Sequence, residues 1–139
     1  MSFREKSAWI TFVLLLAFGI YFGGIARHAI NPTAPHANFF QLFVLLVVTI
    51  VVVEVITHVL IAIRSPGEAR TPRDERERLI ELRSIRPAYF VLLVGAFLSI
   101  VTMHLGVGTW MLVNCVLFAI WIAELTRYGS QLYHYRRGA

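Results

Sequence analysis

Four long apolar stretches constrain this chain of 139 residues more than any other feature. They cover residues 8–25, 39–63, 88–105 and 110–128. A helix needs about 20 predominantly apolar residues to cross the hydrocarbon core of a bilayer, so each stretch is long enough to do so. The chain is 58% hydrophobic and 15% charged, with a mean hydropathy of +0.68. We therefore predict an all-α, four-transmembrane-helix bundle forming a single integral membrane domain over residues 1–139.

The connections predict two antiparallel hairpins. Turn formers and prolines fill residues 31–38, and glycines at 106 and 108 predict a tight turn before the fourth span. Residues 129–139 are predicted to form a basic and aromatic tail.

The loop over residues 64–87 carries seven arginines and five acidic residues. Thr71 as N-cap and Pro72 at the first helical position predict a short charged helix from residue 72 to about 85. Leu79, Leu82 and Ile85 give it a weak apolar stripe that could rest on the bundle or on lipid headgroups. Pro87 disfavours helical geometry at the residue before it, which predicts a break or kink ahead of the third span.

The distribution of positive charge predicts the orientation. If the N-terminus is cytoplasmic, twelve of the thirteen Lys and Arg residues lie on the cytoplasmic side and only Arg27 lies outside. Cytoplasmic loops of membrane proteins carry this excess, so both termini and the loop over 64–87 are predicted to be cytoplasmic. The bias also explains the net charge of +5 without a nucleic-acid partner, because the loop arginines alternate with acids and lack interleaved aromatic residues.

Three ionisable residues inside the spans are candidates for a proton or metal site. Glu54 and His58 are four residues apart and share one helix face. Glu124 lies in the fourth span at nearly the same depth as His58. Such groups are costly in the bilayer and need partners. One interpretation is a hydrogen-bonded pair that fixes the helix register. The alternatives are a proton-coupled site and a divalent-metal site; no other cofactor is predicted.

Further candidates lie near the outer turn and on two helix faces. Met103, His104, Met111 and Cys115 are soft ligands suited to copper(I) or haem, although packing and a bond from His104 to Asn114 would also explain them. Small residues that let helices approach closely could serve packing within the bundle or a homodimer face. These are Gly19, Gly23, Gly95 and Ser99.

Four segments resemble an uncharacterised family of small bacterial four-helix inner-membrane proteins. They are Arg4-Glu5-Lys6-Ser7-Ala8-Trp9, Thr57-His58-Val59-Leu60-Ile61-Ala62-Ile63-Arg64-Ser65-Pro66, Asp74-Glu75-Arg76-Glu77-Arg78-Leu79-Ile80-Glu81 and Arg86-Pro87-Ala88-Tyr89. The resemblance implies a bacterial cytoplasmic membrane and assigns a role to no residue.

The sequence contains no nucleophile with a base at a recognisable spacing, no phosphate loop and no HExxH motif, so an enzyme is not predicted. We predict a non-enzymatic interaction or regulatory protein that docks a partner through its charged loop, and a homodimer is left open as an alternative to packing within one bundle. The alternatives are a small proton-coupled transporter that uses Glu54 and Glu124, and a membrane metal-binding protein.

Overall fold

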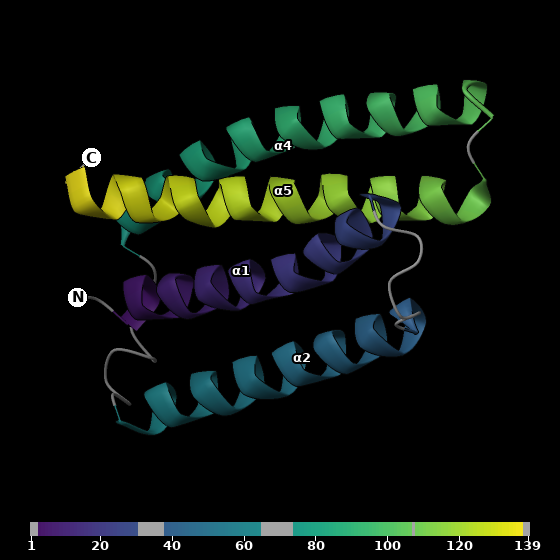
Figure 1. Ribbon diagram of the computed structural model, residues 1–139. Coiled ribbons are helices and arrows are strands. Elements are labelled where there is room, and N and C mark those ends of the chain that lie inside the picture. The colour runs from purple at the N-terminus through teal and green to yellow at the C-terminus, as the bar shows by residue number, and fades with distance from the viewer. Residues whose placement is uncertain (1–2, 31–37, 65–73, 107, 138–139) are drawn as a thin grey trace. The chain divides into compact units, whose positions relative to one another are not determined.

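The computed structural model describes residues 3–30, 38–64, 74–106 and 108–137. These ranges form four helices, α1 (Phe3–Ile30), α2 (Phe39–Arg64), α4 (Glu75–His104) and α5 (Thr109–Arg137) (Figure 1). All four are long and apolar enough to cross a membrane, which confirms the prediction of an all-helical chain with four such segments. The chain divides into two compact units, Met1–Thr71 and Pro72–Ala139, and each is described by itself.

Three of the four helices are clearly longer than the predicted apolar spans: α1 and α5 extend beyond them at both ends, and α4 begins 13 residues earlier. With 28 residues in α1 and 30 in α4, a rise of 1.5 Å per residue gives lengths of roughly 42 and 45 Å. A bilayer is about 30 Å thick in its hydrocarbon core and about 40–45 Å thick with the headgroup regions. The polar ends of these helices therefore have the right length to lie among the headgroups.

Local interactions fix several helix ends. Asn38 caps α2, because its Oδ1 atom accepts a hydrogen bond of 3.3 Å from the backbone N–H of Gln41. Gly106 follows the end of α4 with a φ of +71°, a left-handed conformation that favours glycine. The carbonyl of Gly108 accepts a bond of 2.9 Å from the N–H of Met111 and opens α5. Val107 lies outside the described residues.

In the first unit, α1 and α2 pack side by side in opposite directions (Figure 1). Aromatic rings join them toward the end of α1, where Tyr21 is 1% exposed and its ring centroid lies 5.5 Å from that of Phe43. The ring centroid of Phe18 lies 5.9 Å from that of Phe43. The valine-rich apolar segment of α2 contains no buried residue. Most of its surface is therefore free to face lipid.

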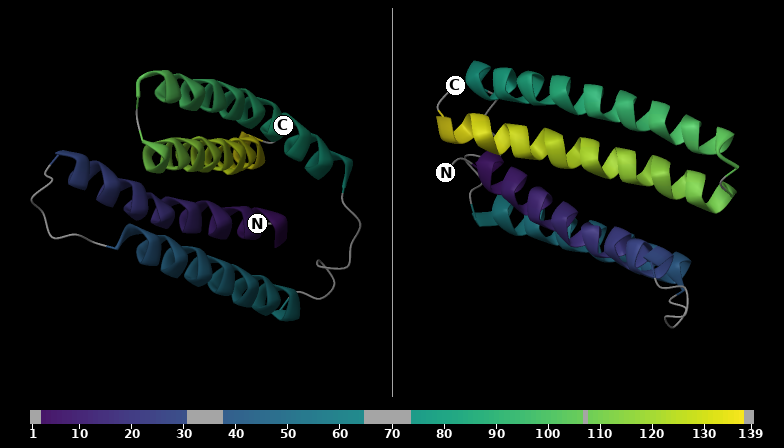
Figure 2. Two further views of the ribbon diagram at one scale, coloured as in Figure 1. Left: turned by 90° about the vertical axis from the view of Figure 1, so that its right-hand side faces the viewer. Right: turned by 45° about the horizontal axis from the view of Figure 1, so that its top comes forward.

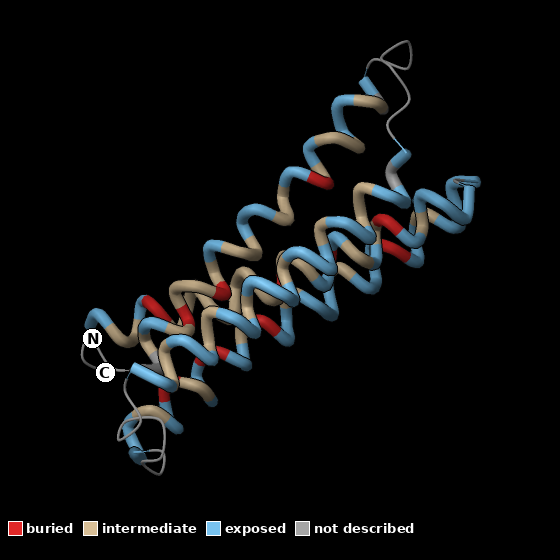
Figure 3. The backbone as a smooth tube through the Cα atoms, turned by 90° about the horizontal axis from the view of Figure 1, so that it is seen from below, coloured by how far each residue is buried: buried red, intermediate tan, exposed pale blue. Residues whose placement is uncertain are grey.

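In the second unit, α4 and α5 run alongside each other and pack more closely (Figure 2). A Cβ atom added at Gly95 would overlap Cβ of Ala119 and lie 3.2 Å from its Cα, so the two backbones are in near contact there. Ile80, Ser84 and Ala88 are buried on the same face of α4 as Gly95. Among the described residues, buried positions are few and lie singly along the helices (Figure 3). Most residues of each helix are exposed or half-buried, which fits helices that face lipid.

The predicted separate helix in the charged loop is wrong for the described residues. Residues 75–87 are the beginning of α4, which continues through Pro87 to His104 without a break. Proline removes one backbone hydrogen bond and favours a helix end, but Ser84 and Ala88 are buried on either side of it, and this packing keeps the chain helical. The described helix begins at Glu75 with Asp74 at the N-cap position. The predicted N-cap Thr71 and Pro72 lie outside the described residues.

Leu79, Leu82 and Ile85 are exposed, and the buried stripe of α4 contains Ile80 and Ser84. The placement of the exposed stripe on the bundle or on lipid headgroups stays a prediction. Ser84 can be buried because its hydroxyl donates a 2.7 Å bond to the carbonyl of Glu81. The predicted tail is also wrong, since α5 continues to Arg137. Basic residues in its last turn interact favourably with the helix dipole.

Candidate functional site

A polar ladder joins α1 to α2 inside the apolar part of the first unit. Thr11 Oγ1 donates a hydrogen bond to Glu54 Oε1 at 3.0 Å. Ser7 Oγ lies 2.5 Å from His58 Nε2, and His58 Nδ1 donates to the backbone carbonyl of Glu54 at 2.8 Å. A carbonyl oxygen can only accept, so Nδ1 carries a proton in this hydrogen bond, while Nε2 faces the Ser7 hydroxyl. Each candidate side chain on α2 therefore has a hydroxyl partner on α1.

The ladder follows from matched spacing on two antiparallel helices. Ser7 and Thr11 are four residues apart, as are Glu54 and His58, so each pair lies on one face of its helix. Residue 7 faces residue 58 and residue 11 faces residue 54, which also brings Tyr21 close to Phe43. Sequence reasoning missed Ser7 and Thr11. The signal that could have found them is a pair of hydroxyl residues with the same spacing near the start of the first span.

The depth of Glu54 makes the ladder chemically informative. Glu54 lies nine residues before Ile63, or roughly 13 Å along the helix from the predicted inner boundary, which is close to the middle of a hydrocarbon core of about 30 Å. Thr11 is 8% exposed, and Glu54 and His58 are half-buried. The described partner of the carboxylate is a neutral hydroxyl. The ladder can therefore fix the register of α1 against α2.

Glu124 has charged partners in the second unit. Arg127 Nη1 lies 3.5 Å from Glu124 Oε2, and Arg127 Nη2 lies 4.0 Å from Glu81 Oε1 on α4. The three side chains are 29–41% exposed. Ion pairs exposed to this extent contribute about 0.2–1 kcal/mol. Glu124 thus belongs to a weak ionic bridge that joins α5 to the polar beginning of α4.

The structure brings the predicted proton- or metal-site residues into two separate groups. Glu54 and His58 lie together in the first unit, and Glu124 lies with Arg127 in the second. Their convergence into one cluster stays a prediction. Within the described part of either unit, no three His, Cys, Asp or Glu side chains gather in a way that could hold a metal ion.

The outer-side candidates make local contacts in the second unit. His104 Nδ1 donates to the carbonyl of Ile100 at 3.3 Å, and Asn114 Nδ2 donates to the carbonyl of Trp110 at 2.8 Å. Among the described residues, the expected bond between His104 and Asn114 is not formed. Met103 and Met111 are exposed, and Cys115 is half-buried with a free thiol.

The small-residue candidates occupy different environments. Gly95 packs on Ala119, and Ser99 is buried one turn further on with its hydroxyl donating to the carbonyl of Gly95 at 2.8 Å. Both therefore serve packing inside the second unit. Gly19 is half-buried, whereas Gly23 is exposed and a Cβ there would meet nothing within 4 Å. A homodimer on this face stays a prediction.

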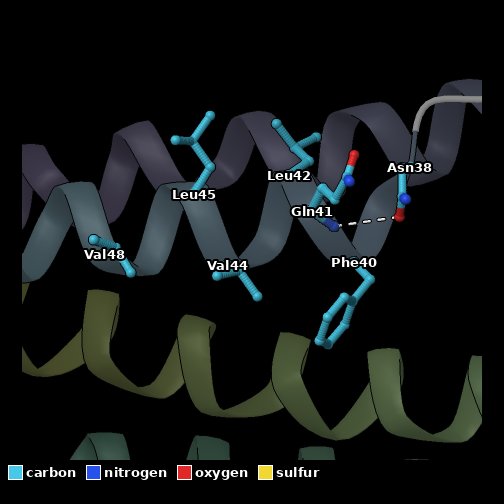
Figure 4. Close-up of a pocket in the computed structure, with 7 residues that line it drawn as sticks. All are labelled: Asn38, Phe40, Gln41, Leu42, Val44, Leu45 and Val48. Atoms are coloured by element: carbon cyan, nitrogen blue, oxygen red, sulfur yellow. Dashed lines mark hydrogen bonds between the residues drawn. The ribbon is translucent and has the colours of Figure 1, made fainter.

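A shallow pocket lies on the first three turns of α2 (Figure 4). Its lining residues all belong to this one helix and its cap. They are Asn38, Phe40, Gln41, Leu42, Val44, Leu45 and Val48. The two polar members, Asn38 and Gln41, are joined by the capping hydrogen bond, and the others present apolar side chains of the kind that lipid tails contact.

No family model, no curated protein and no solved structure matches this chain.

Proposed function

We propose that this protein is a non-enzymatic, multi-pass membrane protein that docks a protein partner through the charged segment between its second and third spans. The observation that carries the proposal is the exposure of Leu79 and Leu82, at 52% and 57%, on the polar beginning of α4. Acidic and basic side chains of this helix surround them, including the exposed Glu75 and Arg78. A protein surface with apolar contacts and charges of both signs complements such a face better than a polyanion does.

The proposed setting is a bacterial cytoplasmic membrane with both termini and this segment on the cytoplasmic side. The one-sided distribution of Lys and Arg supports that orientation, and the family resemblance supports the location. In this proposal the two helix pairs assemble into one bundle, and a second copy of the chain could add to it. The continuity of α4 through Pro87 supports a rigid rather than a flexible docking element.

Replacing both Leu79 and Leu82 by asparagine is expected to abolish docking while leaving the membrane domain folded. Each leucine is exposed, so the change removes contact surface and no core packing. The measurement is photo-crosslinking from position 75 of the full chain in its native membrane. The asparagine variant is expected to form at least tenfold less of the specific crosslinked species than wild type does. The matched control replaces both leucines by methionine, which keeps the face apolar and should preserve the crosslink. An undiminished crosslink in the asparagine variant contradicts the proposal.

A second candidate function is proton-coupled transport through the first unit. It is favoured by the position of Glu54 near the middle of α2, where a carboxylate with a hydroxyl partner could exchange a proton for a substrate. The metal-binding alternative receives no comparable support from the residues that the structure describes in either unit.

For the transport candidate, Glu54→Gln is expected to abolish substrate-driven proton flux in reconstituted vesicles. The amide keeps the shape of the side chain and its acceptor oxygen for Thr11, but it cannot carry the proton. Flux is measured with a pH-sensitive dye trapped inside the vesicles. Glu124→Gln tests the other predicted carboxylate and should retain flux, because Glu124 is already paired with Arg127; loss of flux in Glu124→Gln alone would assign coupling to Glu124 instead. Equal flux from wild type and Glu54→Gln excludes Glu54 as the coupling group.

A further inference from the structure

Two arginines near the beginning of the apolar part of α4 are exposed and have no partner among the described residues. Arg83 and Arg86 are three residues apart and therefore neighbours on one helix face. Neither forms an ion pair, hydrogen bond or ring contact there. Arg127, by contrast, lies between Glu81 and Glu124. The positive charge of Arg83 and Arg86 is therefore free to bind an anion.

Helix register places both arginines at the level of the lipid headgroups. Gly95 contacts Ala119. Because the two helices are antiparallel, eight residues back along α4 and eight residues forward along α5 bring Pro87 opposite Arg127. The Arg127 side chain extends from this level to Glu81, away from the apolar segment. Pro87 therefore marks the edge of the apolar part. Arg86 and Arg83 lie roughly 1.5 and 6 Å beyond it, within the headgroup layer.

Aromatic side chains complete this face on the apolar side. Tyr89 and Phe90 follow Arg86 by three and four residues, and each is 57% exposed. Tyrosine is enriched where hydrocarbon meets headgroups, and arginine matches the geometry of a phosphate group. The order along the helix, with guanidinium groups outside and rings inside, matches the order of phosphate and acyl chain in a phospholipid.

We propose that Arg83, Arg86, Tyr89 and Phe90 form a binding site for an anionic phospholipid, with the phosphate between the two guanidinium groups. The uncompensated charge of two arginines favours a lipid with net negative charge over a zwitterionic one. The site lies nearer the membrane than Leu79 and Leu82. It therefore does not depend on the proposed docking of a protein partner or on which side of the membrane this end faces.

The test is native mass spectrometry of the full chain in detergent with equal amounts of phosphatidylglycerol and phosphatidylcholine. Wild type is expected to retain phosphatidylglycerol about thirtyfold more often, as two charges near a membrane surface predict. Replacing both Arg83 and Arg86 by glutamine should bring the ratio close to one. If that variant does not fold, each single glutamine variant should lower the ratio about fivefold. Added glycerol phosphate should not displace the lipid, because it cannot contact the rings.

The matched control replaces Arg76 and Arg78 by glutamine. It removes the same charge from the same helix but roughly 13–16 Å beyond Pro87, so it should keep the preference for phosphatidylglycerol. The proposal is overturned if wild type shows no preference, if both double variants lose it equally, or if glycerol phosphate displaces the lipid.

Discussion

Replacing Gly95 by leucine is expected to destabilise the second unit by about 1–3 kcal/mol, the usual effect of overpacking a close contact. Even a Cβ atom at this position overlaps that of Ala119 and lies 3.2 Å from its Cα. Backbone atoms cannot rotate away, so α4 and α5 must separate to admit a larger side chain. The separation would also expose Ser99, which is buried one turn away.

The measurement is equilibrium unfolding in mixed micelles, followed by the helical circular dichroism signal. Leucine has a higher helix propensity than glycine, which by itself stabilises a helix. The control must therefore also replace a helical glycine by leucine, but at a position without a clash. Gly23→Leu meets this need, because Gly23 is exposed and a Cβ there has nothing within 4 Å. It should be neutral or stabilising. Equal unfolding midpoints for the two variants would show that Gly95 is not a packing position.

Replacing Thr11 by valine is expected to cost about 1–3 kcal/mol, the penalty for a buried polar group left without its hydrogen bond. The change is nearly isosteric, but it removes the hydroxyl that donates to Glu54 Oε1. The carboxylate then lies at the middle of the span without the partner described for it.

A second substitution isolates the cause. In the double variant Thr11→Val/Glu54→Leu the stranded carboxylate is absent, so most of the lost stability should return. Thr57→Val is the matched control, since the Thr57 hydroxyl donates to the carbonyl of Val53 within its own helix at 2.5 Å. It should change the unfolding free energy by less than Thr11→Val does. If Thr11→Val and Thr57→Val have the same effect, the hydroxyl of Thr11 is not specifically needed by Glu54.

The helix boundaries show which parts of the fold can be predicted from periodicity and composition. The predicted second span, residues 39–63, differs by one residue from α2, because Asn38 caps its beginning and the apolar run ends at Arg64. The fourth helix was predicted nine residues too short, since residues 129–137 are too polar to be recognised by hydropathy. The break at Pro87 was wrong because local proline chemistry was outweighed by packing on both sides of it.

In the candidate site, too, some residues could be predicted from the sequence and others could not. The sequence identified Glu54, His58 and Glu124 because an ionisable residue in an apolar run is recognisable without a structure. Their partners depend on which helix faces meet. Ser7 and Thr11 are ordinary polar residues until α1 packs against α2, and Arg127 reaches Glu81 only because α5 packs against α4.

The sequence by itself determined four helices long and apolar enough to span a membrane, since an apolar run in lipid satisfies all its backbone hydrogen bonds internally only as a helix. It also determined which side chains are costly in lipid and need partners. Tertiary structure alone decided those partners, the near contact of Gly95 with Ala119 and the exposure of Leu79 and Leu82. Such pairings depend on helix rotation and register, which are set by the packing of side chains from both helices together.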